Sequence, residues 1–208
     1  MSSFLVYLIT DPAYDVVEIT RAALSVATPG DVAVMARNKR GSATDLAALG
    51  SALLPICRAR GARLLVNDRC DVAIAIGADG AHLPEAGLSV RAARRVLGPE
   101  ALIGQSRHGP ASDDESASDF VVLGPVGDVP KKGPPMGEHA FAEACASYAQ
   151  PVYALGGVDA ETAPRLVARG ARGVAVIRAI YASSDPAASM ARLLSSIRAR
   201  EDGRPRTH

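Results

Sequence analysis

The stretch RLLVNDRCDVAIAIGADGAHL, residues 63–83, decides the fold because it contains a strand, a helix and a second strand in close succession. Its first segment, RLLV (63–66), is an apolar run without polar alternation, which is typical of a strand buried on both faces. The helix that follows ends at Gly77, where glycine supplies a left-handed cap, and Gly80 then opens a second strand, GAHL (80–83). Two buried strands connected by a helix predict a parallel βαβ unit.

The same alternation of strands and helices extends along the chain. Apolar residues at helical spacing occur between most of the strands, as in 43–61 and 160–170. Strands are predicted at residues 4–9, 31–36, 63–66, 80–83, 101–104, 120–124, 151–155 and 173–177. Eight such units in 208 residues favour a closed barrel over an open sheet. We therefore predict an α/β fold, a single (β/α)8 TIM-barrel domain over residues 1–200, with its site at the C-terminal ends of the strands.

Three segments complete this prediction. Segment 111–118, ASDDESAS, is acidic and nearly free of bulky apolar residues, so we expect only a short or frayed helix there. Segment 186–199 predicts a closing helix, because Asp185 is a reasonable N-cap and Pro186 suits the first helical position. The polar tail, residues 201–208, is predicted to be disordered.

The composition indicates which kind of molecule the protein binds. The 23 basic and 22 acidic residues give a net charge of +1, so charge offers no reason to expect nucleic acid or an anionic membrane. Cys57, Cys70 and Cys145 lack metal-ligand spacing, which favours buried thiols in a reducing compartment over disulfides. The N-terminus lacks a basic leader with a long apolar region, and no segment approaches the roughly 20 apolar residues of a membrane span. We expect a soluble, cytoplasmic protein that binds a small molecule.

The polar residues of the predicted barrel gather where the strands end. Barrel enzymes build their sites from the loops at this face, and here those loops are rich in cations and glycine. Asn67 and Asp68 follow the third strand, where the carboxylate can bind Mg²⁺ and the amide can orient a heterocycle. Alternatively, Asp68 caps the next helix and Asn67 satisfies the loop backbone, and the spacing alone leaves both interpretations open. The loops together predict a site for an anionic small molecule.

A phosphate site is predicted in the loops after the seventh and eighth strands. Gly156 and Gly157 let a phosphate approach backbone N–H groups, and the turn at Ile177 and Arg178 can direct a helix N-terminus at the same anion. The Arg178 guanidinium can add a charge-assisted contact. The alternative is a tight glycine turn beside a solvated arginine.

Further cations lie in two other loops. Lys39 lies beside Arg37 after the second strand and is a predicted phosphate contact. The alternative is an ordinary solvated lysine at the rim. Lys131 and Lys132 lie in GPVGDVPKKGPPMG (124–137), a loop whose glycines and prolines predict a lid that delivers charge. Neither lysine is placed like a Schiff-base lysine, which would emerge from a buried strand.

A resemblance to a known family is carried by an ordered set of segments: YLITD, ARNK, LLVNDRCDVAIAIGADGAHL, IGQSRH, LGPV with KKG, PVYALGGV and GARGVAVIRAIY. Over about residues 5–195 the chain resembles the thiamin-phosphate synthase and thiazole tautomerase (TenI) superfamily. In the synthase, an aminopyrimidine diphosphate loses diphosphate with Mg²⁺ assistance, and the nitrogen of a thiazole phosphate attacks the pyrimidine methylene cation. The resemblance implies roles here for Arg37, Lys39 and Asn67 (diphosphate and pyrimidine), Asp68 (Mg²⁺), Ser106 (leaving group), Lys132 (lid), and Gly157 with Ile177 (thiazole phosphate).

The chain departs from the synthase pattern at several of these positions. Gly87 stands where the family has a second aspartate ligand for Mg²⁺, and Glu85 is a tentative replacement ligand. Met35 matches a usual glutamine, and Val129 and Lys131 match the threonines of the lid. Synthase contacts are therefore missing at three places: the second Mg²⁺ ligand, the glutamine before the strand 2 loop and the lid threonines.

The tautomerase branch resembles the chain better at these positions. Its members lack the second aspartate and use a histidine after the fifth strand as general acid and base, a position that His108 matches. An imidazole can both accept and return a proton near neutral pH. The alternative is that His108 is a loop histidine without a catalytic role, since many synthases also have histidine at this position. Two other histidines, His82 at a strand end and His139 at the start of a helix, are expected to be structural.

We therefore expect a thiamin-biosynthesis enzyme that binds a small phosphorylated heterocycle, with a slight preference for a TenI-like tautomerase that uses His108 and no cofactor. The alternatives are a synthase that requires Mg²⁺ and a non-catalytic phosphate-binding protein. A homo-oligomer is compatible with each.

Overall fold

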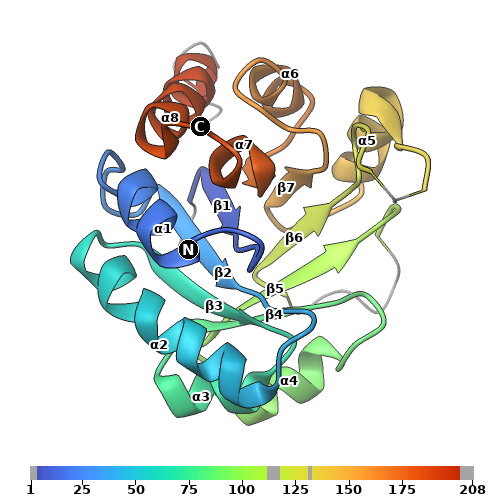
Figure 1. Cartoon of the computed structure of the whole chain (residues 1–208). Coiled ribbons are helices and arrows are strands. Elements are labelled where there is room, and N and C mark those ends of the chain that lie inside the picture. The colour runs from blue at the N-terminus through green and yellow to red at the C-terminus, as the bar shows by residue number, and fades with distance from the viewer. Residues whose placement is uncertain (1–3, 112–117, 131–132, 202–208) are drawn as a thin grey trace.

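The protein's structure, a computed structural model, describes residues 4–111, 118–130 and 133–201. Figure 1 shows a ring of strands surrounded by helices. The strands are β1 (Val6–Ile9), β2 (Val32–Ala36), β3 (Arg63–Asn67), β4 (Gly80–Leu83), β5 (Leu102–Arg107), β6 (Phe120–Leu123), β7 (Val152–Leu155) and β8 (Gly173–Val176). Each strand pairs in parallel with the next, and β8 pairs with β1 to close the barrel. The predicted (β/α)8 barrel is confirmed.

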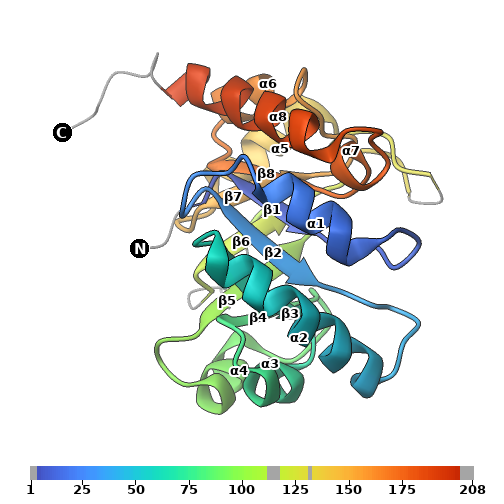
Figure 2. The same ribbon diagram turned by 60° about the vertical axis from the view of Figure 1, so that its left-hand side comes forward.

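The helices lie outside the ring and follow the strands in sequence. Figure 2 shows α8, α1 and α2 side by side across one face of the barrel, and α1 contacts both neighbours. The helices are α1 (Val16–Leu24), α2 (Ala43–Ala59), α3 (Cys70–Ile76), α4 (Val90–Leu97), α5 (Gly137–Ala146), α6 (Ala163–Ala168), α7 (Arg178–Tyr181) and α8 (Pro186–Glu201). No helix in the described ranges is long and apolar enough to cross a bilayer.

The strands separate two apolar layers, because successive side chains of a strand point to opposite faces. Outward-facing residues such as Val34, Val66 and Val174 pack against the helices. Inward-facing residues form a second cluster in which Phe4 and Tyr153 stack with ring centroids 4.4 Å apart, and Phe120 packs edge-on to both. These aromatic rings fill the barrel interior, so a ligand site has room only at the carboxyl ends of the strands.

All eight predicted strands are present, and the largest difference is at β5. It continues to Arg107 instead of ending at residue 104, because its ladder with β6 extends to the Arg107–Leu123 pair. Ser106 was predicted in a loop and is a strand residue instead. A strand position holds its side chain more firmly than a loop would.

The remaining predictions have mixed outcomes. Helix α8 extends to Glu201, two residues past the predicted end at 199, and the rest of the predicted tail lies outside the described residues. Most of segment 111–118 also lies outside them, and the described residues between β5 and β6 contain no helix. All three cysteines are free and buried, as predicted, and burial raises the pKa of the Cys57 thiol to about 12.

Candidate active site

A cavity of about 950 Å³ opens at the carboxyl ends of the strands. Its volume lies at the upper end of the usual range for small-molecule sites, roughly 300–1,000 Å³. Every predicted site residue in the described ranges lines it: Arg37, Lys39, Asn67, Asp68, Glu85, Ser106, His108, Gly156, Gly157, Ile177 and Arg178. Lys131 and Lys132 lie outside the described residues. Residues that are far apart in sequence are therefore brought together around one space.

Asp68 has a backbone conformation that few side chains adopt. Its φ of 65° is the only positive value at a non-glycine residue in the described chain, and aspartate is among the residues that tolerate this region best. The Asp68 amide donates to the His82 carbonyl over 2.8 Å, which fixes this turn against β4. A strained residue held at a cavity rim is a candidate for function.

The structure contradicts one of the two interpretations of Asp68, the helix cap. Helix α3 has Arg69 as its N-cap and no side-chain cap bond, so Asp68 does not cap it. In the described part of the chain, neither the Asn67 amide group nor the Asp68 carboxylate hydrogen-bonds to another residue. Both groups line the cavity and have their hydrogen-bonding capacity available to a ligand.

Arg37 is held where the loop after β2 begins. Thr10 clamps its backbone: the Arg37 amide donates to Thr10 Oγ1 over 2.8 Å, and that hydroxyl donates to the Arg37 carbonyl over 3.0 Å. Burial lowers the pKa of the Arg37 guanidinium, and the nearby Asp11 carboxylate partly offsets this shift. The guanidinium remains charged, because arginine side chains stay protonated in proteins. A half-buried cation of this kind favours an anionic ligand.

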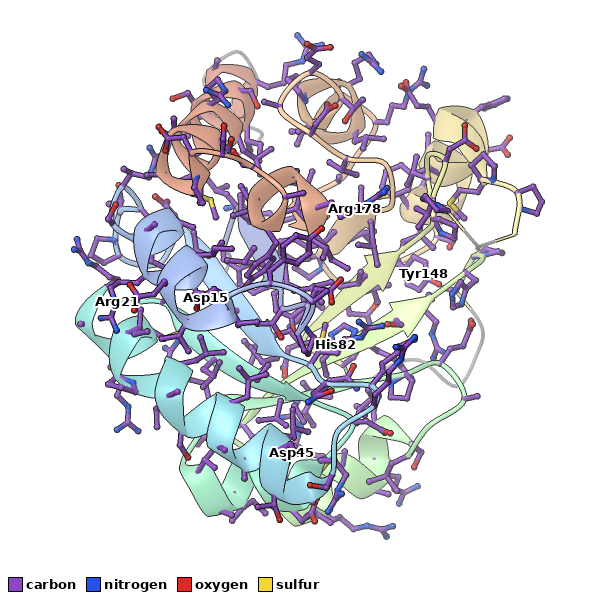
Figure 3. All side chains as sticks on the ribbon, viewed as in Figure 1. Asp15, Arg21, Asp45, His82, Tyr148 and Arg178 are labelled. Carbon is purple, nitrogen blue, oxygen red and sulfur yellow. The ribbon has the colours of Figure 1, made fainter. Side chains whose placement is uncertain are left out.

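His82 is the residue that the sequence interpretation missed. It was expected to be structural, and it is indeed buried, but its side chain also lines the cavity. Figure 3 shows it in the middle of the ring of strands. Its Nε2 lies 2.9 Å from Ser106 Oγ, and burial, aided by the Arg37 charge, lowers the pKa of His82 to about 3. The alternation of side chains along a strand could have identified His82 from the sequence. His82 comes two residues after Gly80, so both positions face the barrel interior.

The loop after β4 contains Glu85, which the sequence analysis named as a replacement metal ligand and which stays a prediction. In this structure its carboxylate is hydrogen-bonded to His108 Nδ1 across the rim. At Gly87, where the resemblance expected an aspartate, an added Cβ would lie 2.6 Å from Pro84 Cγ. The proline ring therefore excludes a side chain at Gly87 in this conformation. The described residues contain no cluster of three or more metal-ligand side chains.

The loops after β7 and β8 present mainly backbone groups to the cavity. Gly156 and Gly157 have φ values of 101° and 65°, which favour glycine. A Cβ on Gly157 would lie 3.0 Å from Gly127 Cα, so the loop after β6 packs directly on this turn. Helix α7 begins at Arg178 and is only four residues long, so its end contributes local amide groups instead of a full helix dipole. Arg178 is exposed and lines the cavity, and Figure 3 shows its position beside α7.

The cavity thus has two differently built sides. We call Arg37, Lys39, Asn67, Asp68 and Ser106 the β2–β5 side, and Gly156, Gly157, Ile177 and Arg178 the β7–β8 side.

Comparison with known proteins places the chain in a family. The thiamine monophosphate synthase family model matches residues 6–180. The chain belongs to that family. One relative is a putative thiamine-phosphate synthase of Geobacter sulfurreducens. It is 40% identical over 193 residues, which cover 88% of this chain and 89% of the relative. The thiamine-phosphate synthase of Gloeobacter violaceus is 36% identical over 92% of this chain, which spans only 57% of that longer protein.

A solved structure agrees with the family assignment. The thiamine phosphate pyrophosphorylase from Pyrococcus furiosus superposes with a TM-score of 0.84 at 26% identity, covering 96% of this chain and 98% of that one. The protein is therefore an enzyme of the thiamin-phosphate synthase and TenI superfamily. Its relatives place it in thiamin biosynthesis. The names of these relatives support the synthase alternative better than the tautomerase that the sequence analysis preferred.

Proposed function

We propose that the protein is a Mg²⁺-dependent thiamin-phosphate synthase, which couples an aminopyrimidine diphosphate to a thiazole phosphate. The observation that carries this proposal is that one cavity contains two separate sets of anion-binding groups, one of side chains and one of backbone. A reaction that joins a diphosphate ester to a second phosphorylated substrate needs two such sets. The tautomerase substrate carries one phosphate and one carboxylate, so a tautomerase has no diphosphate to bind.

The β2–β5 side is suited to the diphosphate ester. The Arg37 guanidinium, Lys39 and the Ser106 hydroxyl can all donate to phosphate oxygens. Charge grows on the diphosphate as its bond to the pyrimidine methylene breaks, and prearranged donors stabilise that charge. Asn67, at the end of β3, can hydrogen-bond the edge of the aminopyrimidine and orient its methylene group.

The donor set fits a magnesium ion that is bound mainly by substrate. Mg²⁺ usually keeps several waters and takes one or two protein carboxylates together with substrate phosphates, and Asp68 offers one such carboxylate. Mg²⁺ held there would neutralise charge on the departing diphosphate. Glu85 is not assigned to the ion, because His108 already binds its carboxylate.

The β7–β8 side is suited to the thiazole phosphate. Gly156 and Gly157 let the phosphate approach the backbone closely, and the Arg178 guanidinium can reach the same anion from the mouth. Apolar groups from Val122, Leu155 and Ala175 lie deeper in the cavity and can pack on the heterocycle. Binding in this way brings the ring nitrogen toward the β2–β5 side, where the methylene cation forms.

One observation favours the tautomerase as a second candidate. A histidine whose Nδ1–H is held by a carboxylate presents Nε2 as a base, and Glu85 holds His108 in this manner at the cavity rim. The candidate therefore predicts that a His108→Ala variant loses proton exchange on a thiazole carboxylate phosphate.

The test is direct turnover by purified protein. Incubation with aminopyrimidine diphosphate, thiazole phosphate and Mg²⁺ is expected to give thiamin phosphate and diphosphate. Absence of coupling together with isomerisation of thiazole carboxylate phosphate would contradict the synthase proposal and support the second candidate. His108→Ala is expected to retain coupling in the synthase and to lose isomerisation in the tautomerase.

A further inference from the structure

The position of His82 is fixed by the barrel interior. Its side chain is 1% exposed and packs against the rings of Tyr7 and Phe120, with centroid distances of 5.5 and 5.9 Å. The residue opposite it on β5 is Gly104, where an added Cβ would lie 2.6 Å from His82 Nδ1. The absence of a side chain at Gly104 thus makes room for the imidazole, and neighbouring rings limit its rotation.

The two ring nitrogens of His82 have different surroundings. Nε2 points to the cavity side and lies 2.9 Å from Ser106 Oγ. Nδ1 is buried and has no hydrogen-bond partner among the described residues. A neutral imidazole carries one proton, and a proton on Nδ1 would be a buried donor without an acceptor. A proton on Nε2 is instead used in the contact with Ser106.

This arrangement determines what the Ser106 hydroxyl can do. A serine hydroxyl has one donor hydrogen and two acceptor lone pairs. If Nε2–H donates to Oγ, one lone pair is occupied and the hydroxyl hydrogen stays available for a different partner. Ser106 and Arg37 line the same cavity, so an anion bound by the guanidinium is a suitable acceptor.

We propose that His82 is a positioning residue, which donates from Nε2 to Ser106 Oγ and thereby directs the Ser106 hydroxyl hydrogen toward the diphosphate oxygens of the substrate. The diphosphate part of this inference rests on the proposed function. Ser106 then acts as a fixed hydrogen-bond donor, not as a nucleophile, because the imidazole holds its proton on the nitrogen that faces Oγ and cannot accept another there.

A binding cycle tests this role without requiring turnover. Inorganic diphosphate with Mg²⁺ is titrated by calorimetry into wild-type protein and into Ser106→Ala, His82→Leu and the double variant. Hydrogen bonds to charged groups predict that each single variant binds about tenfold more weakly or worse. The double variant is expected to bind no more weakly than Ser106→Ala, since His82 acts through the hydroxyl. His82→Gln is expected to stay within about threefold of wild type, because its amide N–H can replace Nε2–H.

Three further measurements complete the test. His139→Gln, a change at an exposed histidine on α5, is the matched control and is expected to leave binding unchanged. Thermal unfolding establishes that each variant is folded. Nitrogen NMR of the wild-type protein with labelled histidines is expected to show a neutral Nε2–H tautomer for His82, and this readout needs no variant.

Each outcome is decisive for the positioning role. Additive losses in the double variant, unchanged affinity in Ser106→Ala, or an Nδ1–H tautomer would each overturn it. A wild-type protein that binds diphosphate but forms no thiamin phosphate would reject the proposed function alone, and the cycle would still decide the role of His82. If His82→Leu does not fold, the tautomer and the paired results of Ser106→Ala and His82→Gln decide it.

Discussion

The two sides of the cavity use different kinds of chemistry. On the β2–β5 side, charged and polar side chains such as Arg37 and Asp68 extend from strand ends, and their charge is what they contribute. On the β7–β8 side, Gly156 and Gly157 lie at positive φ, and in the proposed function their lack of a side chain lets a ligand approach the backbone. The first side should therefore be sensitive to changes of charge at constant shape, and the second to changes of shape at constant charge.

The largest effect is expected from Asp68→Asn, which changes charge but little else. Loss of one group that stabilises developing charge typically costs about 10²–10³ in rate, so coupling should fall at least 100-fold. Asparagine also tolerates a positive φ, so the Tm should change by only a few degrees. Rates and thermal melts check both statements.

Asp71→Asn is the matched control for this change. Asp71 is exposed on α3, pairs with Arg69 and does not line the cavity. Coupling within about twofold of wild type is expected, in line with the small effect of most exposed ion pairs. Comparable losses in Asp68→Asn and Asp71→Asn would contradict a special role for the cavity carboxylate.

A smaller but broader effect is expected from Gly157→Ala on the other side. The new Cβ would approach Gly127 Cα at 3.0 Å in a backbone with φ of 65°, so the turn must shift. We expect a loss of about 1–3 kcal/mol in the free energy of unfolding and roughly tenfold weaker thiazole phosphate binding. Diphosphate binding should be unchanged. Denaturant unfolding and calorimetry measure these quantities.

Gly30→Ala separates strain from crowding. Gly30 has φ of 91°, and an added Cβ would meet nothing within 4 Å. This variant should lose stability without losing affinity for thiazole phosphate. If Gly157→Ala binds thiazole phosphate as tightly as Gly30→Ala does, the β7–β8 side is not the thiazole phosphate site.

Arg178→Ala should have a more modest effect that is restricted to one ligand. Its guanidinium is exposed, so water screens its attraction to phosphate, and a five- to tenfold loss of thiazole phosphate affinity is expected. Calorimetry with diphosphate as the second ligand provides the comparison. Equal losses for both ligands would mean that the two sides do not bind separate anions.

Apart from the control variants, the smallest effect is expected from Glu85→Gln. Because its carboxylate binds His108 and not the proposed metal position, the Mg²⁺ concentration that gives half-maximal coupling should change by less than about threefold. Titration of the coupling rate with Mg²⁺ measures this value. A tenfold increase in the required concentration would restore Glu85 as a metal ligand.

The sequence predicted the barrel because buried parallel strands give unbroken apolar runs, as in 63–66 and 120–124. It predicted the polar residues at the cavity rim, because such residues follow those apolar runs directly, as Asn67 and Arg37 do. The family resemblance, not spacing, supplied the distinct roles of these residues.

What the sequence could not predict depends on contacts between distant segments. The pairing of Glu85 with His108 joins two loops, and no local pattern indicates it. The positive φ of Asp68 depends on a bond to the neighbouring strand. His82 was expected to be structural, and its side chain is in fact buried. Only the closed barrel reveals that its Nε2 meets Ser106 at the cavity.

The most direct test of the central claim is a single coupling assay. Purified protein is given aminopyrimidine diphosphate and thiazole phosphate, with Mg²⁺ in one sample and a chelator in the other, and thiamin phosphate is quantified. The two-sided cavity predicts product with Mg²⁺ and a rate reduced to background with the chelator. No product in either sample, with both substrates bound, would contradict the synthase assignment.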